Sequence, residues 1–298
     1  MVEGPSRSLE DRAATSYTSL RLHTQNVWLW SITVAALVLF YPVILRLVQD
    51  WWVDPDYTYG FLIPVFTVYA LRRNLADKTL ELRPNTVGLP VFLAGMIILS
   101  AGILSSELFL SRISMLITVA GLVLFLAGFP FFRAILFPLS YLAFAVPIPN
   151  LVYNQITLPL QFASSRAAES MLRFIAIPVF REGNILTIPN CSLEVAQACS
   201  GFRSLMALLA VAVAVAYLTE RSNYVRVFLV ALIFPIAIFT NGLRVCIVGV
   251  LAYLIDPNWA TGSAHLILGW LLLIFAVSVF LAMCTLSRRV RSKGMSLR

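Results

Sequence analysis

Charged residues are scarce in this chain. Only 12% of its 298 residues are Asp, Glu, Lys or Arg, and 60% are hydrophobic, whereas a soluble domain usually carries about 25% charged residues. The mean hydropathy is +0.87. This composition excludes an ordinary soluble domain and predicts a polytopic membrane protein with a single integral domain.

Metal ligands and nucleotide-binding motifs are scarce as well. The chain has four cysteines, none of them in a CxxC pair, and two histidines, His23 and His265. It contains no HExxH, P-loop or Rossmann glycine set. We therefore expect no metal and no cofactor. The net charge of +8 comes from basic residues in short segments between apolar runs, a pattern that indicates membrane topology and no nucleic-acid partner.

Long apolar runs dominate the sequence, and a helix needs about 20 consecutive apolar residues to cross a membrane. They predict an all-α polytopic membrane protein, a bundle of about eight transmembrane helices. The eight predicted spans are Val27–Val48, Phe61–Leu71, Val87–Leu104, Ile113–Gly128, Ala134–Val146, Phe202–Leu218, Val227–Leu254 and Ala264–Leu286. We expect a disordered cytoplasmic tail at 1–26, an integral domain at 27–287 and a basic cytoplasmic tail at 288–298.

The segment 150–198 lacks a clean span and is expected to form an extracytoplasmic insert. From Ile156 to Ile177, apolar residues recur at helical spacing beside a polar face, which is typical of an amphipathic helix at a membrane interface. After Pro178, short apolar pieces alternate with turn formers, which predicts a small β-hairpin or meander.

The basic residues predict the orientation of the chain. Eight spans place both termini on one side, and most Lys and Arg residues then fall in the two tails and the loops of that side. By the positive-inside rule that side is the cytoplasm. In this topology Cys199, Arg244 and His265 all approach the extracytoplasmic face.

Those three residues form a candidate catalytic set. Cys199 would act as a thiolate nucleophile activated by His265, while Arg244 would lower the pKa of the thiol and stabilise an oxyanion. An arginine inside an apolar helix costs at least about 2.5 kcal/mol unless it finds water, a partner or a functional cavity. Asn241, one turn earlier, is expected to bond Arg244 or line the same cavity.

Structural interpretations compete with this chemistry. A buried cysteine is more often a packing residue, and Cys199 could equally form a disulfide with Cys191. His265 could be an interfacial hydrogen-bonding residue. We expect Arg203 and Glu194 to bind substrate together with Asn241, but they could instead pair as surface charges. Cys246, Cys284 and Gly269 are interpreted as packing residues, with Gly269 allowing a neighbour to approach closely.

Three blocks of sequence resemble the signature blocks of the exosortase and archaeosortase family. They are Leu-Glu-Val-Ala-Gln-Ala-Cys-Ser-Gly-Phe-Arg-Ser-Leu at 193–205, Asn-Gly-Leu-Arg at 241–244 and Gly-Ser-Ala-His-Leu-Ile-Leu-Gly-Trp at 262–270. The segments 159–161 and 177–184 also resemble it. In this order and spacing, on a multispan chain, the blocks are strongly specific.

The resemblance implies a membrane-embedded cysteine transpeptidase or protease in the inner membrane of a bacterium. Its partners would be the lipid bilayer and membrane-anchored precursor proteins that bear a C-terminal sorting signal of Pro-Glu-Pro type, and its processing would be linked to surface attachment and exopolysaccharide production. Cys199 matches the nucleophile of the family, Arg244 its arginine and His265 its histidine. The chain departs from the family at Thr58-Tyr59-Gly60, where many members carry Ser-His-Gly.

Two other classes of function remain open from the residues alone. One is a transporter or exopolysaccharide-export component with a polar substrate site at Arg244 and Asn241. The other is a structural scaffold for an envelope complex. Loss of the thiol at Cys199 would leave either of these unaffected, and it would abolish the activity of a cysteine enzyme.

Overall fold

A computed structural model describes residues 31–296 except 32–33, 37, 77–79, 190, 196–200 and 257–262, and for 263–266 and 287–296 it describes the backbone alone. The chain divides into two units, Met1–Gln49 and Asp50–Arg298. In the first unit, residues 38–49 are helical. The predicted tail 1–26 and the start of the predicted span Val27–Val48 lie outside the described residues.

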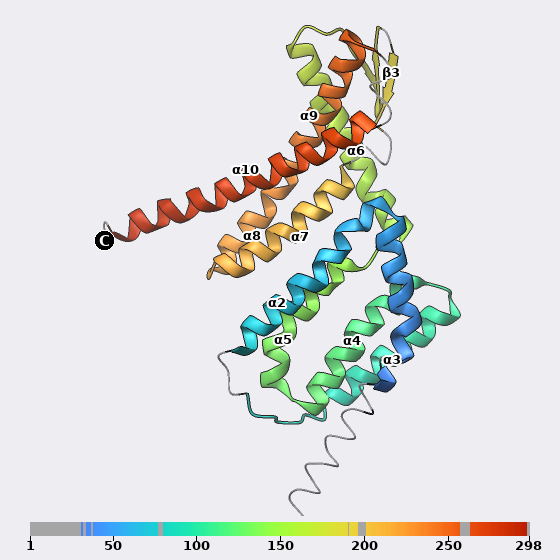
Figure 1. Cartoon of the computed structure of the whole chain (residues 1–298), viewed down its shortest axis with the longest axis vertical. Coiled ribbons are helices and arrows are strands. Elements are labelled where there is room, and N and C mark those ends of the chain that lie inside the picture. Colours follow the sequence, from blue (N-terminus) through green and yellow to red (C-terminus); the bar gives the residue numbers. More distant parts are fainter. Residues whose placement is uncertain are drawn as a thin grey trace, which may run out of the picture. The chain divides into compact units, whose positions relative to one another are not determined.

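The first half of the second unit is built from helices (Figure 1). A short 3-10 helix η1 (Pro55–Phe61) begins at Asp54, whose side chain accepts a hydrogen bond from the amide of Asp56. The elements that follow are α2 (Leu62–Ala76), α3 (Gly88–Leu104), α4 (Leu108–Leu126), α5 (Phe129–Tyr141) and the 3-10 turn η2 (Leu142–Ala145). Helix α2 packs against α5, and α3 packs against α4.

Small residues set the close approach of α3 to α4. Gly88, Gly95 and Gly102 recur every seven residues and therefore lie on one face of α3. A Cβ at Gly95 would stand 2.4 Å from the Thr118 hydroxyl of α4, and one at Gly102 would stand 2.6 Å from the Ser111 hydroxyl. Side chains cannot fit there, so the two backbones pack directly, as is common among membrane helices.

The second half of the unit combines helices with a small sheet. Its elements are α6 (Asn150–Phe174), β1 (Phe180–Glu182), β2 (Ile185–Ile188), β3 (Cys191–Glu194), α7 (Phe202–Thr219), α8 (Asn223–Ala231), α9 (Ile233–Leu254) and α10 (Ser263–Ser296). Helix α6 packs along α9, and α7 contacts α8, α9 and α10. One buried apolar cluster joins α7, α8, α9 and α10 and includes Leu208, Ile233 and Phe280.

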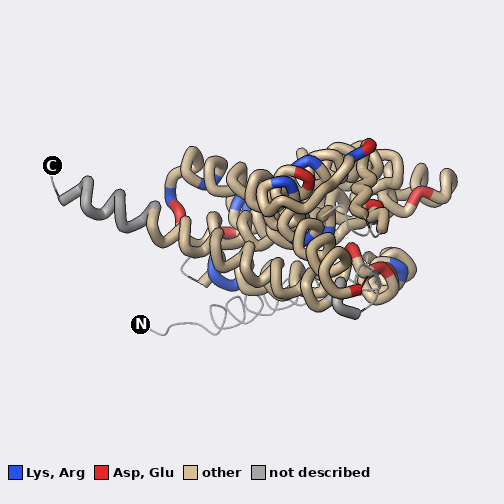
Figure 2. Tube along the Cα trace, turned by 90° about the horizontal axis from the view of Figure 1, so that it is seen from above, with Lys and Arg blue, Asp and Glu red and all other residues tan. Residues whose placement is uncertain are grey.

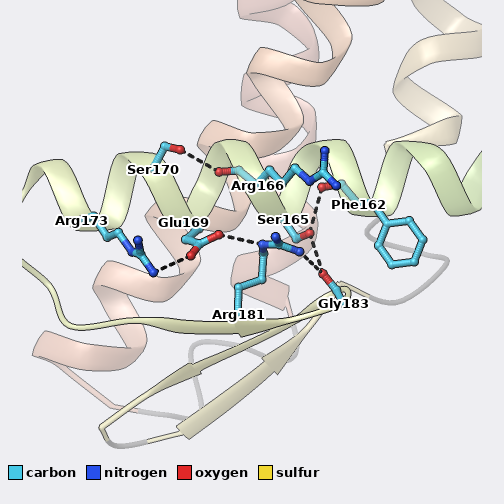
Figure 3. Close-up of polar contacts among 8 residues, drawn as sticks. All are labelled: Phe162, Ser165, Arg166, Glu169, Ser170, Arg173, Arg181 and Gly183. Atoms are coloured by element: carbon cyan, nitrogen blue, oxygen red, sulfur yellow. Dashed lines mark hydrogen bonds and ion pairs between the residues drawn. The ribbon is translucent and has the colours of Figure 1, made fainter.

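The three strands form an antiparallel meander in the order β1-β2-β3. The predicted meander is confirmed. The alternative, a two-stranded hairpin, is wrong because the sheet has a third strand. Figure 3 shows how the sheet is tied to α6: Glu169 accepts from Arg181 at 2.7 Å and pairs with Arg173 at 2.7 Å, and the Ser165 hydroxyl contacts the Gly183 carbonyl at 3.2 Å. Beneath these contacts, Leu172 and Leu186 are fully buried.

The predicted polar face of α6 is wrong in part. An interfacial helix would turn Gln161, Ser164 and Ser165 toward water, but all three are buried, and Leu158 and Phe162 are exposed instead. In an apolar environment polar groups are stabilised by other protein groups rather than by the surroundings. Arg166 and Arg173 remain exposed, as expected for the second half of the helix.

Among the described residues, fewer than eight helices are long and apolar enough to cross a membrane by themselves. In the described part of the chain, four helical stretches are long and apolar enough to cross a membrane: Leu108–Leu126, Phe202–Thr219, Asn223–Leu254 and Ile267–Leu286. A fifth is possible if Phe129–Ala145 and Asn150–Phe174, bent by 80°, form one broken span. Helix α3, with 17 residues, and α2, with 15, are shorter. Eight spans are therefore not confirmed, although Figure 2 shows long stretches without charge between the blue and red positions.

Candidate functional site

A small cavity joins three helices around Arg244. Ser204 of α7, Thr240, Asn241 and Arg244 of α9, and Gly269 of α10 line it together with apolar residues of α10. Its volume of about 10 Å³ leaves room for about one water molecule. The prediction that Asn241 and Arg244 line one cavity is confirmed.

The guanidinium of Arg244 lies beside Gly269 of α10, and both line this cavity. A Cβ at Gly269 would stand 3.4 Å from Cζ of Arg244 and 3.5 Å from one of its terminal nitrogens. Both distances are ordinary contact for a side chain, so the neighbour of Gly269 is Arg244, but close approach that depends on a glycine stays a prediction. His265 stands one turn earlier on the same helix, and its side chain lies outside the described residues.

Asn241 connects α9 to α6 and to the start of α7. Its side-chain amide donates a hydrogen bond of 2.9 Å to the Ser164 hydroxyl, and both residues are buried. Gly201 precedes α7 with a φ of 81°, a left-handed conformation that favours glycine. A Cβ there would stand 2.8 Å from the Asn241 amide carbon. Gly201 follows Cys199 by two residues, and Cys199 itself lies outside the described residues.

Arg203 pairs with a partner that the sequence did not indicate. Its guanidinium donates to one carboxylate oxygen of Asp56 at 3.2 Å, and the Tyr153 hydroxyl donates to the other oxygen at 2.7 Å. Glu194 is exposed at the end of β3. The interpretation that Arg203 and Glu194 form a surface pair is thus replaced by an Arg203–Asp56 pair between α7 and η1.

Arg203 and Asp56 line a cleft of about 580 Å³. Asp50, Asp54, Tyr57, Pro147 and Tyr153 contribute to the same walls. Burial raises the pKa of the Tyr57 phenol to about 12, and its oxygen accepts a hydrogen bond from the Ile148 amide. Tyr57 therefore stays protonated at physiological pH and contributes a neutral, polar wall.

Asp50, in the same cleft, also pairs with a buried arginine. The Arg112 side chain of α4 is only 3% exposed, and one of its terminal nitrogens lies 2.6 Å from an Asp50 carboxylate oxygen. The sequence analysis overlooked this pair and the roles of Asp56 and Tyr153. For Arg112 a signal existed, because it too is an arginine within an apolar run, the feature that singled out Arg244.

The departure Thr58-Tyr59-Gly60 lies in η1, close to the start of α7. The Thr58 hydroxyl bonds the Pro55 carbonyl at 3.1 Å, and Gly60 packs on the indole of Trp51. The ring of neighbouring Tyr57 meets Phe202 edge to face, with centroids 6.4 Å apart. Since Phe202 follows Cys199 by three residues, this segment lies beside the block that carries the candidate nucleophile.

The described cysteines serve packing. Cys191 in β3 is a half-buried free thiol, so the structure does not show the alternative disulfide with Cys199. Burial raises the pKa of the Cys191 thiol, which disfavours the reactive thiolate. Cys246 is buried between α6, α9 and the sheet, and Cys284 is buried in the cluster around α7. Among the described residues, no group of three or more His, Cys, Asp or Glu side chains is placed to hold a metal ion.

Comparison with known proteins agrees with the resemblance of the three blocks. The family model described as transmembrane exosortase matches residues 51–284, a range that includes Cys199, Arg244 and His265. No curated protein matches the chain, and no solved structure matches it. Because the match spans most of the chain and all three signature blocks, the protein belongs to the transmembrane exosortase family.

Proposed function

We propose that this membrane protein is a cysteine transpeptidase or protease that cleaves C-terminal sorting signals of Pro-Glu-Pro type from membrane-anchored precursor proteins. Cys199 is the nucleophile, His265 the acid and base, and Arg244 the group that stabilises the oxyanion. The reaction passes through a thioester at Cys199. The enzyme faces the extracytoplasmic side of the inner membrane, and both termini are cytoplasmic.

The observation that carries the proposal is the meeting of the three blocks around Arg244. Arg244 lies beside Gly269, one turn from His265 on α10, and both line the small cavity. Asn241, one turn before Arg244, lies against Gly201, two residues after Cys199. Blocks separated by tens of residues in the sequence therefore approach one cavity, which supports a shared chemical task over three separate packing roles.

The chemistry follows from the three residue types. His265 takes the thiol proton of Cys199, and the thiolate attacks the carbonyl carbon of the scissile peptide. The negative charge that develops on the carbonyl oxygen is stabilised by the guanidinium of Arg244, which is permanently positive. The C–N bond then breaks, and His265 returns its proton to the leaving amine. Water or an acceptor amine finally attacks the thioester, and the thiol of Cys199 is released.

Substrate binding falls to residues around this centre. Arg203 stands one turn after Cys199 in the sequence and lines the cleft of about 580 Å³, which is large enough for several side chains of an extended peptide. Asn241 packs against the turn at Gly201. Glu194, five residues before Cys199 in the sequence, is exposed at the end of β3. The cavity beside Arg244 has space for about one water, which favours a group acting on a peptide at its rim over a transport site.

The test is processing of a co-expressed precursor that carries the sorting signal, followed by intact mass spectrometry of the product. We expect Cys199→Ala to abolish cleavage, Cys199→Ser to reduce it severely, and the matched control Cys191→Ser to leave it unchanged. The mass of the new C-terminus distinguishes hydrolysis from transfer. Cleavage at the wild-type rate by Cys199→Ala, in a protein that still inserts into the membrane, would reject the proposal.

A further inference from the structure

A second large groove, lined by residues outside the three signature blocks, lies between α5, α7, α8 and the start of α9. Its volume is about 590 Å³, and its walls are apolar almost throughout, with Phe137, Val213, Val230 and Phe234 among them. Two polar groups, Asn223 and Arg226, stand at its α8 end. No part of the proposed peptide chemistry uses this groove.

The groove opens at a membrane surface. The residues 220–222 connect two of the candidate spans, Phe202–Thr219 and Asn223–Leu254. A connection between two spans lies where the hydrocarbon core ends, so Asn223 and Arg226 stand at headgroup depth. The apolar walls extend from there toward the hydrocarbon.

Arg226 is held in a fixed position. Its guanidinium donates to the Glu220 carbonyl at 2.8 Å and to the Tyr217 carbonyl at 3.4 Å, and it lies over the ring of Tyr217, 5.4 Å from the centroid. The floor beneath it is also rigid, because Tyr217 stacks on Phe137 at 3.5 Å and its hydroxyl donates to Asn74. A preorganised cation of this kind loses little entropy when it binds an anion.

The surroundings of the opening are positive. Arg73 donates to the Leu218 carbonyl at the end of α7, and Arg221 is exposed in the connection itself. The only carboxylate between residues 219 and 226 is Glu220, which is 4% exposed. Within residues 219–226, the exposed charge is therefore that of arginines.

We propose that this groove is a binding site for an anionic phospholipid. One acyl chain occupies the apolar walls, and the phosphate contacts Arg226 and Asn223, since guanidinium groups form strong charge-assisted hydrogen bonds with phosphate. A transmembrane helix is a poorer occupant. Helices that end at a basic membrane surface carry Lys or Arg at that end, and such flanks would be repelled by Arg73, Arg221 and Arg226.

The experiment uses the full-length protein in nanodiscs that contain equal amounts of palmitoyl-oleoyl phosphatidylglycerol and palmitoyl-oleoyl phosphatidylcholine. After release, native mass spectrometry counts the lipids retained on each chain. We expect the wild type to retain a single phosphatidylglycerol, favoured over phosphatidylcholine by about tenfold, because both lipids carry the phosphate but the choline cation of phosphatidylcholine is repelled by the exposed arginines.

Three variants make the assignment specific. Arg226→Gln should lose the preference for phosphatidylglycerol, whereas Arg221→Gln, in the same connection and exposed, should keep it. Ala231→Phe places a ring in the groove at an exposed position of α8 and should lower retention of both lipids. Equal retention of the two lipids by the wild type, full retention by Ala231→Phe, or a protein dimer in place of a bound lipid would each overturn the proposal.

Discussion

The guanidinium of Arg244 lies beside Gly269 of the neighbouring helix: a Cβ at position 269 would stand 3.4 Å from Cζ of the arginine, an ordinary van der Waals contact. An arginine on one helix is thus the neighbour of a glycine on another, one turn from His265. This proximity specifies where the positive charge sits relative to α10. It also makes Gly269 a sensitive position for testing the role of that charge.

Substitutions of Gly269 should act according to their size. Gly269→Ala adds one methyl group at ordinary contact distance, and we expect precursor processing to fall less than about threefold. Gly269→Leu requires the guanidinium to move by about 1 Å or more, and a displacement of that size lowers the rate of a positioned reaction by about a hundredfold. Processing rates in cells at matched protein levels provide the measurement. Equal processing rates for Gly269→Leu and the wild type would show that the reaction does not depend on the position of Arg244.

Ser164→Ala should weaken the support of the site from α6. The Ser164 hydroxyl is the acceptor for the buried Asn241 amide at 2.9 Å, and removing an acceptor from a buried donor costs about 1–3 kcal/mol. We expect a lower melting temperature in detergent and slower processing. Ser170→Ala is the matched control, because that hydroxyl bonds only the Arg166 carbonyl on the exposed side of the same helix. Identical melting temperatures for the two variants would contradict the assignment.

Asp56→Asn should affect substrate binding more than chemistry. It removes the charge that holds Arg203 at 3.2 Å, while an amide oxygen can still accept from Tyr153. Because the Arg203 side chain is 35% exposed, the lost pair costs stability no more than about 1 kcal/mol. We expect KM for a precursor peptide to rise several-fold with kcat nearly unchanged. Glu81→Gln, which breaks the exposed pair with Arg83, should change neither constant.

The sequence was sufficient for the membrane class, the meander and the convergence of Asn241 and Arg244, because each depends on strong local signals. Long apolar runs, turn formers between short apolar pieces and an arginine within an apolar helix all have direct physical meanings. The small size of Gly269 predicted a close neighbour, but the structure leaves room for a Cβ there at ordinary contact distance. The identity of that neighbour required the packing of α9 against α10.

Contacts between elements far apart in the sequence explain the two predictions that were wrong, the exposure of the polar face of α6 and the partner of Arg203. The polar residues of α6 indicated an interface with water, but α9 presents Asn241 and Gly242 to Ser164, which is buried there. Arg203 has Glu194 as its nearest acidic residue in the sequence, yet η1 brings Asp56 to it from 147 positions away. Periodicity identifies a polar face, and only packing decides what covers it.

Cys191 provides a pH-dependent test of which thiol is reactive. Burial raises the pKa of the Cys191 thiol above its usual value, so the thiolate, which is the form that reacts with maleimides, is rarer at neutral pH than in an unfolded chain. In a Cys199→Ala background we expect labelling at position 191 by N-ethylmaleimide to be slow at pH 7, to accelerate as the pH approaches the raised pKa, and to become fast at pH 7 after denaturation. Peptide mass spectrometry at each pH identifies the labelled cysteine. If Cys191 reacts at pH 7 as fast in the folded protein as in the denatured one, it is exposed to the reagent and becomes a competitor of Cys199 for the role of nucleophile.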